Sequence, residues 1–355
     1  MQHEQPETTF TPIAEIGEFG LIARLQEIVA EELPAEVIQG IGDDAAVYRT
    51  GNREVHVLTT DMLIEGVHFD RMVTPMKHLG YKALSVNVSD VAAMNAFPLY
   101  ATVDLGLPNY ISVEMVEDIY RGIARAAAEY GVHIVGGDTS AARQLVIGIT
   151  VVGRQQENRI VYRKGAKEGD LICVTGDLGG AYAGLKILME NKRIFLEQGQ
   201  EMQPDLEPYA YVIERHLLPR ARMDVVYTLA EADVLPHALI DISDGLASEI
   251  HHICRQSGTG AELFAPAIPI HLDTRRVADM FGDDVDTYAL FGGEDYELLF
   301  TLPEADFNRL PEGIASVIGK ITEAEAGICI QTGLGTTVRL EPAGYQHFSS
   351  NERHP

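Results

Sequence analysis

Cysteine is scarce in this chain, and the features of an exported or membrane protein are missing. The 355 residues include three cysteines, none in a CxxC pair: Cys173, Cys254 and Cys329. This odd, scattered set argues against a disulfide framework and a structural zinc site, and is typical of a reducing compartment. The N-terminus MQHEQPETTF is polar and acidic, whereas a signal peptide needs basic and then apolar residues. No apolar run approaches the roughly 20 residues that span a bilayer, so we expect a cytoplasmic protein.

Basic side chains are outnumbered by acidic ones. The chain has 27 Lys and Arg against 53 Asp and Glu, a formal net charge of −26. Such a charge repels nucleic acids and anionic membranes, so neither is expected as a partner. Hydrophobic residues make up 46% and charged residues 23% of the chain, which is typical of a globular protein. The length suffices for two domains, each with its own core.

Common phosphate-binding and nucleophile motifs are also missing. The segment GDLGG at 176–180 follows an apolar run but lacks GK[ST], so it predicts a tight turn and not a P-loop. The chain contains neither a GxSxG nucleophile elbow nor the HRD and DFG motifs of protein kinases. A function in phosphate chemistry would therefore need another scaffold.

Four motifs that combine aspartate with glycine or a hydroxyl residue each follow an apolar run. The four motifs are GIGDDAAV at 40–47, TTD at 59–61, GGDT at 136–139 and DISDG at 241–245. One such aspartate alone is commonly a helix N-cap or a turn residue. Four together indicate a shared purpose, because Mg²⁺ is held by a few carboxylates together with the phosphates of a substrate. We interpret the set as a divalent-metal site that faces a polyphosphate.

Seven aspartates are candidate metal ligands, in these motifs or on the predicted helix between them: Asp43, Asp44, Asp61, Asp90, Asp138, Asp241 and Asp244. Crowded carboxylates raise each other's pKa unless cations bind between them. Nearby hydroxyls either cap turns or bind metal-bound water and phosphate: Thr59, Thr60, Thr139 and Ser243. Ser243 lies where the following helix would present its positive end, which favours phosphate.

Three further positions are open to two interpretations each. His68 in EGVHF is either a hydrogen-bonded core residue or a ligand contact. Arg163 in YRKGAKEGD is either a salt-bridge partner or a phosphate clamp. Glu294 and Asp295 follow two glycines, which allow a ligand to approach closely, although an ordinary loop pair is the simpler interpretation.

Helical and strand-like patterns alternate along the chain. Helices are predicted over 18–33, 74–94, 113–130, 181–189, 224–232 and 246–256. The second of these is expected to have Thr74 as its N-cap and Pro75 in its first turn. Strands are predicted over 55–60, 101–107, 132–135, 145–152, 171–175 and 238–242, and a glycine turn at 291–300 leads into another. The alternation predicts a two-domain α/β (α+β) fold.

A polar stretch at 154–169 divides this pattern and predicts a domain boundary. We expect a mobile leader at 1–16, an N-terminal domain at 17–160 and a C-terminal α/β domain at 161–355. A second polar stretch, at 194–206, is predicted to be a flexible excursion.

Taken in order, seven motifs resemble the thiamine-monophosphate kinase family: GIGDDAAV, TTDMLIEGVHF, YKALSVNVSDVAAM, GGDT, YRKGAKEGD, DISDGLASEI and FGGEDYELLF. GIGDD and GGDT alone indicate the wider aminoimidazole-ribonucleotide synthetase-like superfamily, whereas EGVHF, NVSDVAAM and GGEDYEL are typical of the thiamine branch. The resemblance runs from about residue 17 to residue 348. One departure is AMNA at 93–96, where the family usually reads AMGA; Asn95 tolerates the left-handed conformation that a turn there needs.

The resemblance implies ATP-dependent phosphorylation of thiamine monophosphate to thiamine diphosphate, the final step of thiamine diphosphate biosynthesis. It implies direct transfer with several Mg²⁺ ions and no discrete acid–base residue, because an acceptor phosphate is already ionised near neutral pH. It also implies a two-domain synthetase-like fold. The N-terminal domain would bind ATP and Mg²⁺ and form a homodimer through its sheet, and the active site would lie in the cleft beside the C-terminal domain.

Carried over motif by motif, the resemblance assigns three groups of residues. The metal positions fall on Asp43, Asp44, Thr59, Thr60, Asp61, Asp90, Asp138, Asp241 and Asp244. The nucleotide positions fall on Tyr120, Gly137, Asp138, Arg163 and Ser243. The positions near the thiamine phosphate fall on His68, Glu294 and Tyr345.

Two alternatives belong to other functional classes. A sister enzyme of the superfamily would use ATP to activate another acceptor. A selenophosphate synthetase would have a reactive cysteine near its N-terminus, whereas the first cysteine here is Cys173, and the hydrogenase-maturation ATPase would end in cysteine, whereas this chain ends in Pro355. A non-catalytic protein would bind Mg–ATP through the same residues without consuming it.

Overall fold

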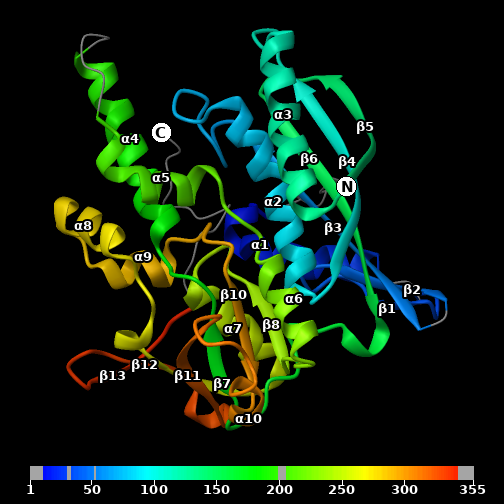
Figure 1. Cartoon of the computed structure of the whole chain (residues 1–355), viewed down its shortest axis with the longest axis vertical. Coiled ribbons are helices and arrows are strands. Elements are labelled where there is room, and N and C mark those ends of the chain that lie inside the picture. Colours follow the sequence, from blue (N-terminus) through cyan, green and yellow to red (C-terminus); the bar gives the residue numbers. More distant parts are fainter. Residues whose placement is uncertain (1–10, 30–32, 52, 199–204, 343–355) are drawn as a thin grey trace, which may run out of the picture.

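The computed structural model describes residues 11–29, 33–51, 53–198 and 205–342, which form two β-sheets with helices packed around them (Figure 1). Helices and strands alternate through both halves of the chain, so the predicted α/β (α+β) class is confirmed. None of the helices in the described part of the chain is long and apolar enough to cross a membrane.

The first sheet comes from the N-terminal half of the chain. Within the described residues its strands follow the order β1-β2-β3-β6-β4-β5. Their bounds are β1 Val37–Gln39, β2 Ala46–Gly51, β3 Glu54–Ile64, β4 Phe97–Leu107, β5 His133–Ala141 and β6 Val146–Gln156. β4 and β5 pair in parallel, and the other neighbours are antiparallel. β5 therefore forms an edge of this sheet.

Two helices, α2 (Met76–Ala93) and α3 (Val113–Tyr130), lie together along one face of the first sheet (Figure 1). They approach so closely that glycine is required at the contact. A Cβ atom on Gly80 would lie 1.9 Å from the carbonyl oxygen of Ile119, and one on Gly122 would lie 1.9 Å from that of Lys77. This contact fixes α2, which carries several residues of the site described below.

The second sheet comes from the C-terminal half, with the order β13-β12-β9-β11-β7-β10-β8 among the described strands. Their bounds are β7 Leu171–Val174, β8 Ala238–Asp241, β9 Gly260–Phe264, β10 Leu298–Leu302, β11 Ser316–Thr322, β12 Ile328–Gln331 and β13 Thr337–Arg339. β9 and β12 pair in parallel, and the other pairs are antiparallel. The helices of this half are α4 Gly180–Gln198, α5 Ala210–Leu217, α6 Met223–Glu231, α7 Leu246–Ser257, α8 Leu272–Phe281, α9 Val285–Phe291 and α10 Glu304–Phe307.

The largest buried apolar cluster joins the two halves. It contains α2 and α3 residues together with Val225 and Leu229 of α6, Leu239 of β8 and Phe300 of β10. Helix α2 thus packs against its own sheet on one side and against the C-terminal half on the other. This arrangement brings the end of β8 close to α2 and β3.

The helix at 113–130 is confirmed, and Ser112 caps it by accepting a hydrogen bond from the backbone N of Met115 at 3.3 Å. The helix at 74–94 is confirmed, but its N-cap is Pro75, in extended conformation, and not Thr74. Asn95 after it has φ 53°, the left-handed conformation expected there.

The first predicted helix differs in its position. α1 runs over Ile13–Ile28, so part of the expected leader at 1–16 is helical, and its backbone breaks at Gly17 with φ 66°. The expected helix end at 33 is wrong, because Val29 already caps α1. The excursion at 194–206 is partly helical, since α4 extends to Gln198; residues 199–204 lie outside the described residues.

Two strands are longer than predicted, and this changes where their aspartates lie. β3 continues beyond Asp61 to Ile64, and β5 continues through the whole GGDT motif to Ala141. Asp61 and Asp138 are therefore inside strands, whereas Asp241 is the last residue of β8, which ends one residue before the predicted limit at 242. In a strand, neighbouring side chains point to opposite faces, so these motifs divide their residues between two faces.

Candidate active site

A cavity of about 1090 Å³ is lined by residues of both halves of the chain. Its walls come from α1, β3, the segment at 66–74, α2, the first turns of α4, the end of β8, α7 and the segment at 292–296. Most of the predicted site residues line it: His68, Asp43, Asp44, Thr59, Thr60, Asp61, Asp90, Arg163, Asp241, Ser243, Asp244 and Glu294. The cavity is therefore the candidate active site.

Three aspartates from distant parts of the chain meet on one wall of this cavity. Asp44 precedes β2, Asp90 lies in the last turn of α2, and Asp241 ends β8. One carboxylate oxygen from each lies within 4.8 Å of the other two. Thr59 on β3 donates a hydrogen bond to Asp90 Oδ2, and Ser89 on α2 donates one to Asp241 Oδ2, both at 2.5 Å. The two hydroxyls fix the orientation of these carboxylates.

The crowding of these acids changes their proton affinity. Burial, and then the charge of Asp44, raise the pKa of Asp43 and of Asp241 to about 7. Burial and Asp44 raise the pKa of Asp61 to about 6. Burial, and then the charges of Asp61 and Asp241, raise the pKa of Asp90 well above its usual range. The chain itself supplies too little positive charge for this wall.

Arg163 faces the cluster with its guanidinium. Nε of Arg163 donates to Asp44 Oδ1 at 3.1 Å, a second guanidinium nitrogen donates to the same oxygen, and its backbone N donates to Asp43 Oδ1 at 3.3 Å. The Arg163 charge lowers the pKa of Asp43 but does not outweigh burial and Asp44. Arg163 thus lies at the cluster, and its guanidinium is held by Asp44.

The residues of this wall fit a divalent cation. Among the described residues, Asp43 Oδ2, Asp44 Oδ2 and Glu249 Oε2 are buried side-chain oxygens that accept no hydrogen bond. Such oxygens are costly to bury unless a donor or a cation reaches them. Carboxylate and hydroxyl oxygens at this spacing are the hard ligands that Mg²⁺ prefers.

A second group of charged residues forms another part of the cavity. Glu294 receives a hydrogen bond from Lys82 Nζ to its Oε2 at 2.9 Å, and His216 Nδ1 lies 3.3 Å from the same oxygen. Burial opposes ionisation of Glu294, but Lys82 and then His216 outweigh it and lower the pKa of Glu294. Burial lowers the pKa of His216 to about 4, so its ring is neutral near neutral pH. His68 faces this group, and its Nδ1 accepts from the backbone N of Ile64 at 3.0 Å.

Four predicted site residues are not brought to the acidic cluster within one chain. Asp138 and Gly137 lie on the exposed edge strand β5, and Tyr120 lies on α3 and is 39% exposed; none of the three is among the residues that line the cavity. Thr60 lines it, but its hydroxyl points to the other face of β3 from Thr59 and bonds Ile149 O at 3.1 Å. Tyr345 lies outside the described residues.

The remaining two predicted site residues, Ser243 and Asp244, lie in the turn between β8 and α7. Ser243 and Asp244 both line the cavity, and Glu249 on α7 accepts from the backbone N of Asp244 at 2.9 Å. Burial and the charge of Asp244 raise the pKa of Glu249 well above its usual range. Glu249 therefore holds this turn, a role that the sequence analysis missed.

Lys82, Ser89 and His216 were likewise not predicted as site residues. Lys82 and Ser89 are seven residues apart, two helical turns, on a helix whose other residues are largely apolar. Lys82 lies eight residues before Asp90, so helical spacing places the three polar residues on neighbouring faces. This spacing could have indicated that Lys82 and Ser89 belong to the site. No motif near His216 in the sequence indicates a role for it.

Two family models together match most of the chain. AIR synthase related protein, N-terminal domain, matches residues 42–155, and AIR synthase related protein, C-terminal domain, matches residues 167–330. Thiamine-monophosphate kinase of Aquifex aeolicus is 36% identical over 337 residues, which is 95% of this chain and 99% of that protein. Thiamine-monophosphate kinase of Bacillus subtilis is 33% identical over 345 residues, 94% of this chain and 100% of that protein.

A solved structure has the same fold as this chain over nearly the whole length of both. It is AaThiL complexed with AMPPCP and TMP, which is 35% identical to this chain, with a TM-score of 0.81 over 96% of this chain and 100% of that one. The predicted resemblance and the two-domain synthetase-like fold are thereby confirmed.

Proposed function

Because this chain belongs to the thiamine-monophosphate kinase family, we propose that it transfers the γ-phosphoryl group of ATP directly to the phosphate of thiamine monophosphate. The products are ADP and thiamine diphosphate, and the reaction is the final step of thiamine diphosphate biosynthesis. The observation that carries the proposal is the group Asp44, Asp90 and Asp241, whose oxygens lie within 4.8 Å on the wall of a cavity that also contains Glu294.

The acidic wall would hold the metal of the reaction. We assign this role to Asp43, Asp44, Thr59, Asp61, Asp90, Asp241 and Asp244, with Thr60 and Asp138 as the remaining predicted members. Several bound Mg²⁺ ions would supply charge neutralisation for the phosphate groups. Arg163 and Ser243 lie on the same part of the cavity and would donate hydrogen bonds to phosphate oxygens of the nucleotide. Because the acceptor phosphate is already ionised near neutral pH, no covalent phospho-enzyme is expected on this route.

The other part of the cavity suits the acceptor. Its lining is apolar and aromatic, with Phe69, Tyr182, Leu185 and Met189. Thiamine monophosphate has flat rings and a positively charged thiazolium. Lys82 occupies Oε2 of Glu294, which leaves Oε1 for the ligand, and the lowered pKa of Glu294 keeps the carboxylate ionised. An ionised carboxylate within an apolar lining favours a cationic aromatic ligand.

A homodimer would explain the residues that lie away from the cluster. The outer face of the first sheet exposes Leu58, Met62 and Tyr100, so it has the apolar character of a contact surface. Asp138 lies at this face's edge strand. We propose that two copies pair through these sheets and that Tyr120, Gly137 and Asp138 serve the nucleotide site of the partner copy.

This proposal is tested by mixing two inactive variants, Asp138→Ala and Asp241→Ala. In a mixed dimer one site would combine the intact Asp241 of one copy with the intact Asp138 of the other, so activity should be restored. No recovery would contradict the assignment.

We also propose that the enzyme is cytoplasmic and that the chain divides near residue 160 into an N-terminal domain at 17–160 and a C-terminal domain at 161–355. All three cysteines are free thiols, in keeping with a reducing compartment. The gap between the two matched family models, 156–166, supports a boundary there.

The first experiment is to incubate the purified protein with ATP, Mg²⁺ and thiamine monophosphate and to separate the thiamine species by chromatography. We expect ADP and thiamine diphosphate in equal amounts, and no product after chelation of the metal. If the folded protein binds Mg–ATP but forms no thiamine diphosphate, its acceptor belongs to another chemical class. Conversion of free thiamine to the monophosphate would contradict the assignment of the Glu294 region.

A further inference from the structure

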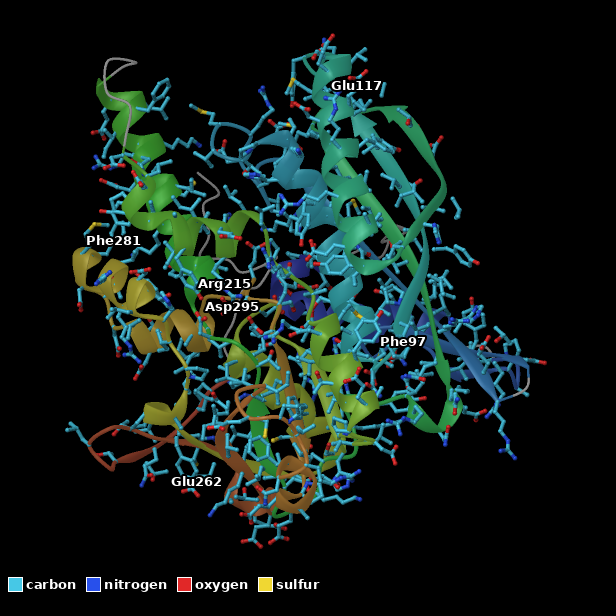
Figure 2. The ribbon with its side chains drawn as sticks, in the orientation of Figure 1. Phe97, Glu117, Arg215, Glu262, Phe281 and Asp295 are labelled. Atoms are coloured by element: carbon cyan, nitrogen blue, oxygen red, sulfur yellow. The ribbon has the colours of Figure 1, made fainter. Side chains whose placement is uncertain are left out.

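The segment at 292–297, which contains GGEDYE, alternates its side chains between the cavity and the protein interior. Glu294 and Tyr296 line the cavity. Asp295 and Glu297 are 1% and 2% exposed and do not line it. Figure 2 shows Asp295 next to Arg215, whereas Glu117 lies far from them on α3. The segment thus has a ligand-facing side and a side anchored in the interior.

The backbone of this segment is held in an unusual conformation. Glu294 has φ 59° and Tyr296 has φ 52°, in the left-handed region that residues other than glycine rarely adopt. A bulky residue such as tyrosine adopts it only when its surroundings enforce it. Two enforcing contacts come from the end of β8: the backbone N of Glu294 donates to Ser243 O at 2.7 Å, and that of Tyr296 donates to Ile242 O at 2.9 Å.

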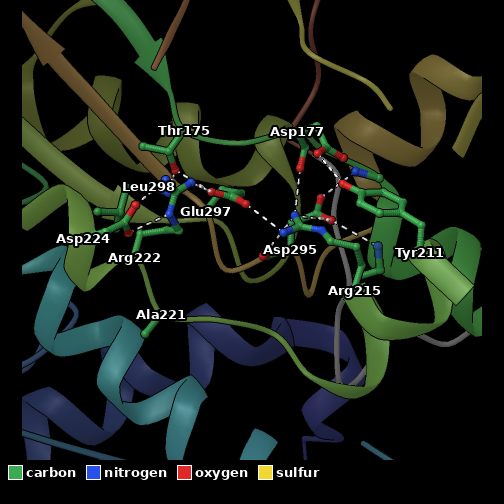
Figure 3. A network of polar contacts seen from close by, with 12 residues as sticks. Thr175, Asp177, Tyr211, Arg215, Ala221, Arg222, Asp224, Asp295, Glu297 and Leu298 are labelled. Carbon is green, nitrogen blue, oxygen red and sulfur yellow. Dashed lines mark hydrogen bonds and ion pairs between the residues drawn. The ribbon is translucent and has the colours of Figure 1, made fainter. Parts of the chain in front are cut away.

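The anchored side is held by two partly buried arginines, Arg215 and Arg222 (Figure 3). Glu297 accepts from Arg215 at 2.8 Å through Oε1, and from Arg222 and Thr175 at 2.5 Å and 2.6 Å through Oε2. Asp295 lies 3.7 Å from an Arg215 nitrogen and accepts from the backbone N of Gly179 at 2.7 Å. Asp295 and Glu297 are therefore both fixed by contacts on the side of the segment that faces away from the cavity.

Arg215 also fixes a second wall of the same part of the cavity. Its Nη2 donates to the carbonyl oxygen of Asp177 at 2.8 Å, in the glycine turn that begins α4. Asp295 accepts from Gly179 N and Ala181 N in that turn. α4 then carries the cavity residues Tyr182, Leu185 and Met189. One guanidinium thus joins α4 to the segment that presents Glu294.

We propose that Arg215 is a positioning residue for the phosphate acceptor, and that Arg222 supports it by holding the second oxygen of Glu297. Neither arginine lines the cavity, so both act through Glu294, Tyr296 and the start of α4. The acidic wall rests on β3, α2 and β8. Arg215 therefore affects acceptor binding selectively and leaves the Mg–nucleotide site in place. This inference rests on the proposed function, because it assigns the Glu294 part of the cavity to the acceptor.

The test compares Arg215→Met and Arg215→Lys with a matched surface control, Arg193→Met. Arg193 lies on α4, the helix that carries Tyr182, Leu185 and Met189, and its side chain is 56% exposed, with ion pairs to Glu190 and Glu197. For Arg215→Met we expect the KM for thiamine monophosphate to rise about tenfold or more, because small displacements of binding groups are costly, while the KM for ATP changes less than about twofold. Lysine keeps the charge but not the planar fork, so Arg215→Lys should lie between wild type and Arg215→Met.

Calorimetric binding of thiamine monophosphate to protein saturated with Mg²⁺ and a non-hydrolysable ATP analogue should show the same order of affinities. Thermal unfolding of each variant identifies any variant that fails to fold. If Arg215→Met does not fold, the KM values of Arg215→Lys are compared with those of the wild type instead. Equal rises in both KM values, or a loss of kcat alone, would overturn the positioning role, as would unchanged kinetics. A wild-type protein that forms no thiamine diphosphate would instead overturn the proposed function.

Discussion

Buried carboxylates gather in two regions of this molecule, and the regions differ in how the chain satisfies them. In the network of Figure 3, both oxygens of Glu297 accept hydrogen bonds from arginine or threonine. In the acidic wall, Asp43 Oδ2 and Asp44 Oδ2 accept none from the described residues. Arg215 and Arg222 both face Glu297, and Arg215 also faces Asp295, whereas Arg163 is shared by Asp43 and Asp44.

The comparison separates structural acids from functional ones. A carboxylate whose oxygens are matched by the chain's own donors is part of the scaffold, because removing a partner leaves a buried charge uncompensated. The unmatched oxygens of Asp43 and Asp44 line a cavity, where a divalent cation from outside the chain fits them. Asp295 is intermediate: burial raises its pKa to about 7, although Arg215 and the amides of Gly179 and Ala181 lower it.

The largest expected effect is on turnover, after a change in the acidic wall. Asp241→Asn removes one ligand charge but keeps an acceptor for Ser89, so we expect turnover to fall by about three orders of magnitude. Without metal, stability should be unchanged or higher, because burial raises the pKa of Asp241 to about 7 and its ionisation is unfavourable. Turnover and thermal unfolding in chelator measure both, and near-wild-type turnover would contradict the assignment.

The corresponding change in the arginine network should act on stability instead. Glu297→Gln leaves Arg215 and Arg222 buried without their shared countercharge, so we expect the free energy of unfolding to fall by about 3–5 kcal/mol. Urea denaturation measures this, with the exposed Glu197→Gln as the control, since Glu197 pairs with Arg193 on the surface. If both variants have the stability of the wild type, the network does not stabilise the fold.

A third effect is the pH dependence of the metal-free protein. Burial raises the pKa of Asp43 and of Asp241 to about 7 and, together with Asp44, that of Asp61 to about 6. These groups stay protonated in the folded state while the unfolded chain ionises near pH 4. Their contribution to stability is therefore complete below about pH 4 and is lost as the pH rises to about 7.

We therefore expect Mg²⁺ to stabilise the protein more at about pH 8 than at about pH 5, because only ionised carboxylates bind it. Urea denaturation at the two pH values, with chelator and with Mg²⁺, gives the four free energies of unfolding. The difference should be smaller for Asp43→Asn. Equal stabilisation by Mg²⁺ at both pH values would show that ionisation of these carboxylates does not control Mg²⁺ binding.

The smallest effect is expected at the cavity rim, where Lys192 of α4 pairs with Asp70. Both side chains are about a quarter exposed, at 22% and 27%, so this pair resembles neither buried region. For Lys192→Met we expect the free energy of unfolding to change by at most about 1 kcal/mol. A loss as large as that of Glu297→Gln would show that partial exposure does not weaken such a pair.

The sequence was most informative where residue type and spacing were unusual. Asp43, Asp44, Asp90 and Asp241 were predicted from motifs, and the structure places all four on one cavity. The β-strand limits were predicted less well, because TTD and GGDT read as strand ends although β3 and β5 continue through them. Alternation along a longer strand then puts Thr60 on the other face from Thr59.

The contacts that position Glu294 were beyond prediction from local patterns. Lys82 precedes Glu294 by 212 residues, and Arg215 precedes Glu297 by 82. A buried lysine or arginine looks like a surface residue in sequence until the fold shows its partner. The first helix was misplaced for the opposite reason: apolar residues such as Leu25 and Ile28 suggested a buried face, yet they are 48% and 77% exposed.

Helix α2 has a consequence for how ligands enter and leave. Its Asn87 accepts a hydrogen bond from Asp61 N on β3, its Ser89 bonds Asp241 on β8, and its Lys82 holds Glu294. The spacing between the two halves is thus set by the side chains of one rigid rod that is itself locked to α3 through Gly80 and Gly122. Separation of the halves would break both the Ser89–Asp241 and the Lys82–Glu294 hydrogen bond. We therefore expect substrates and products to exchange through the opening of the cavity without separation of the two halves.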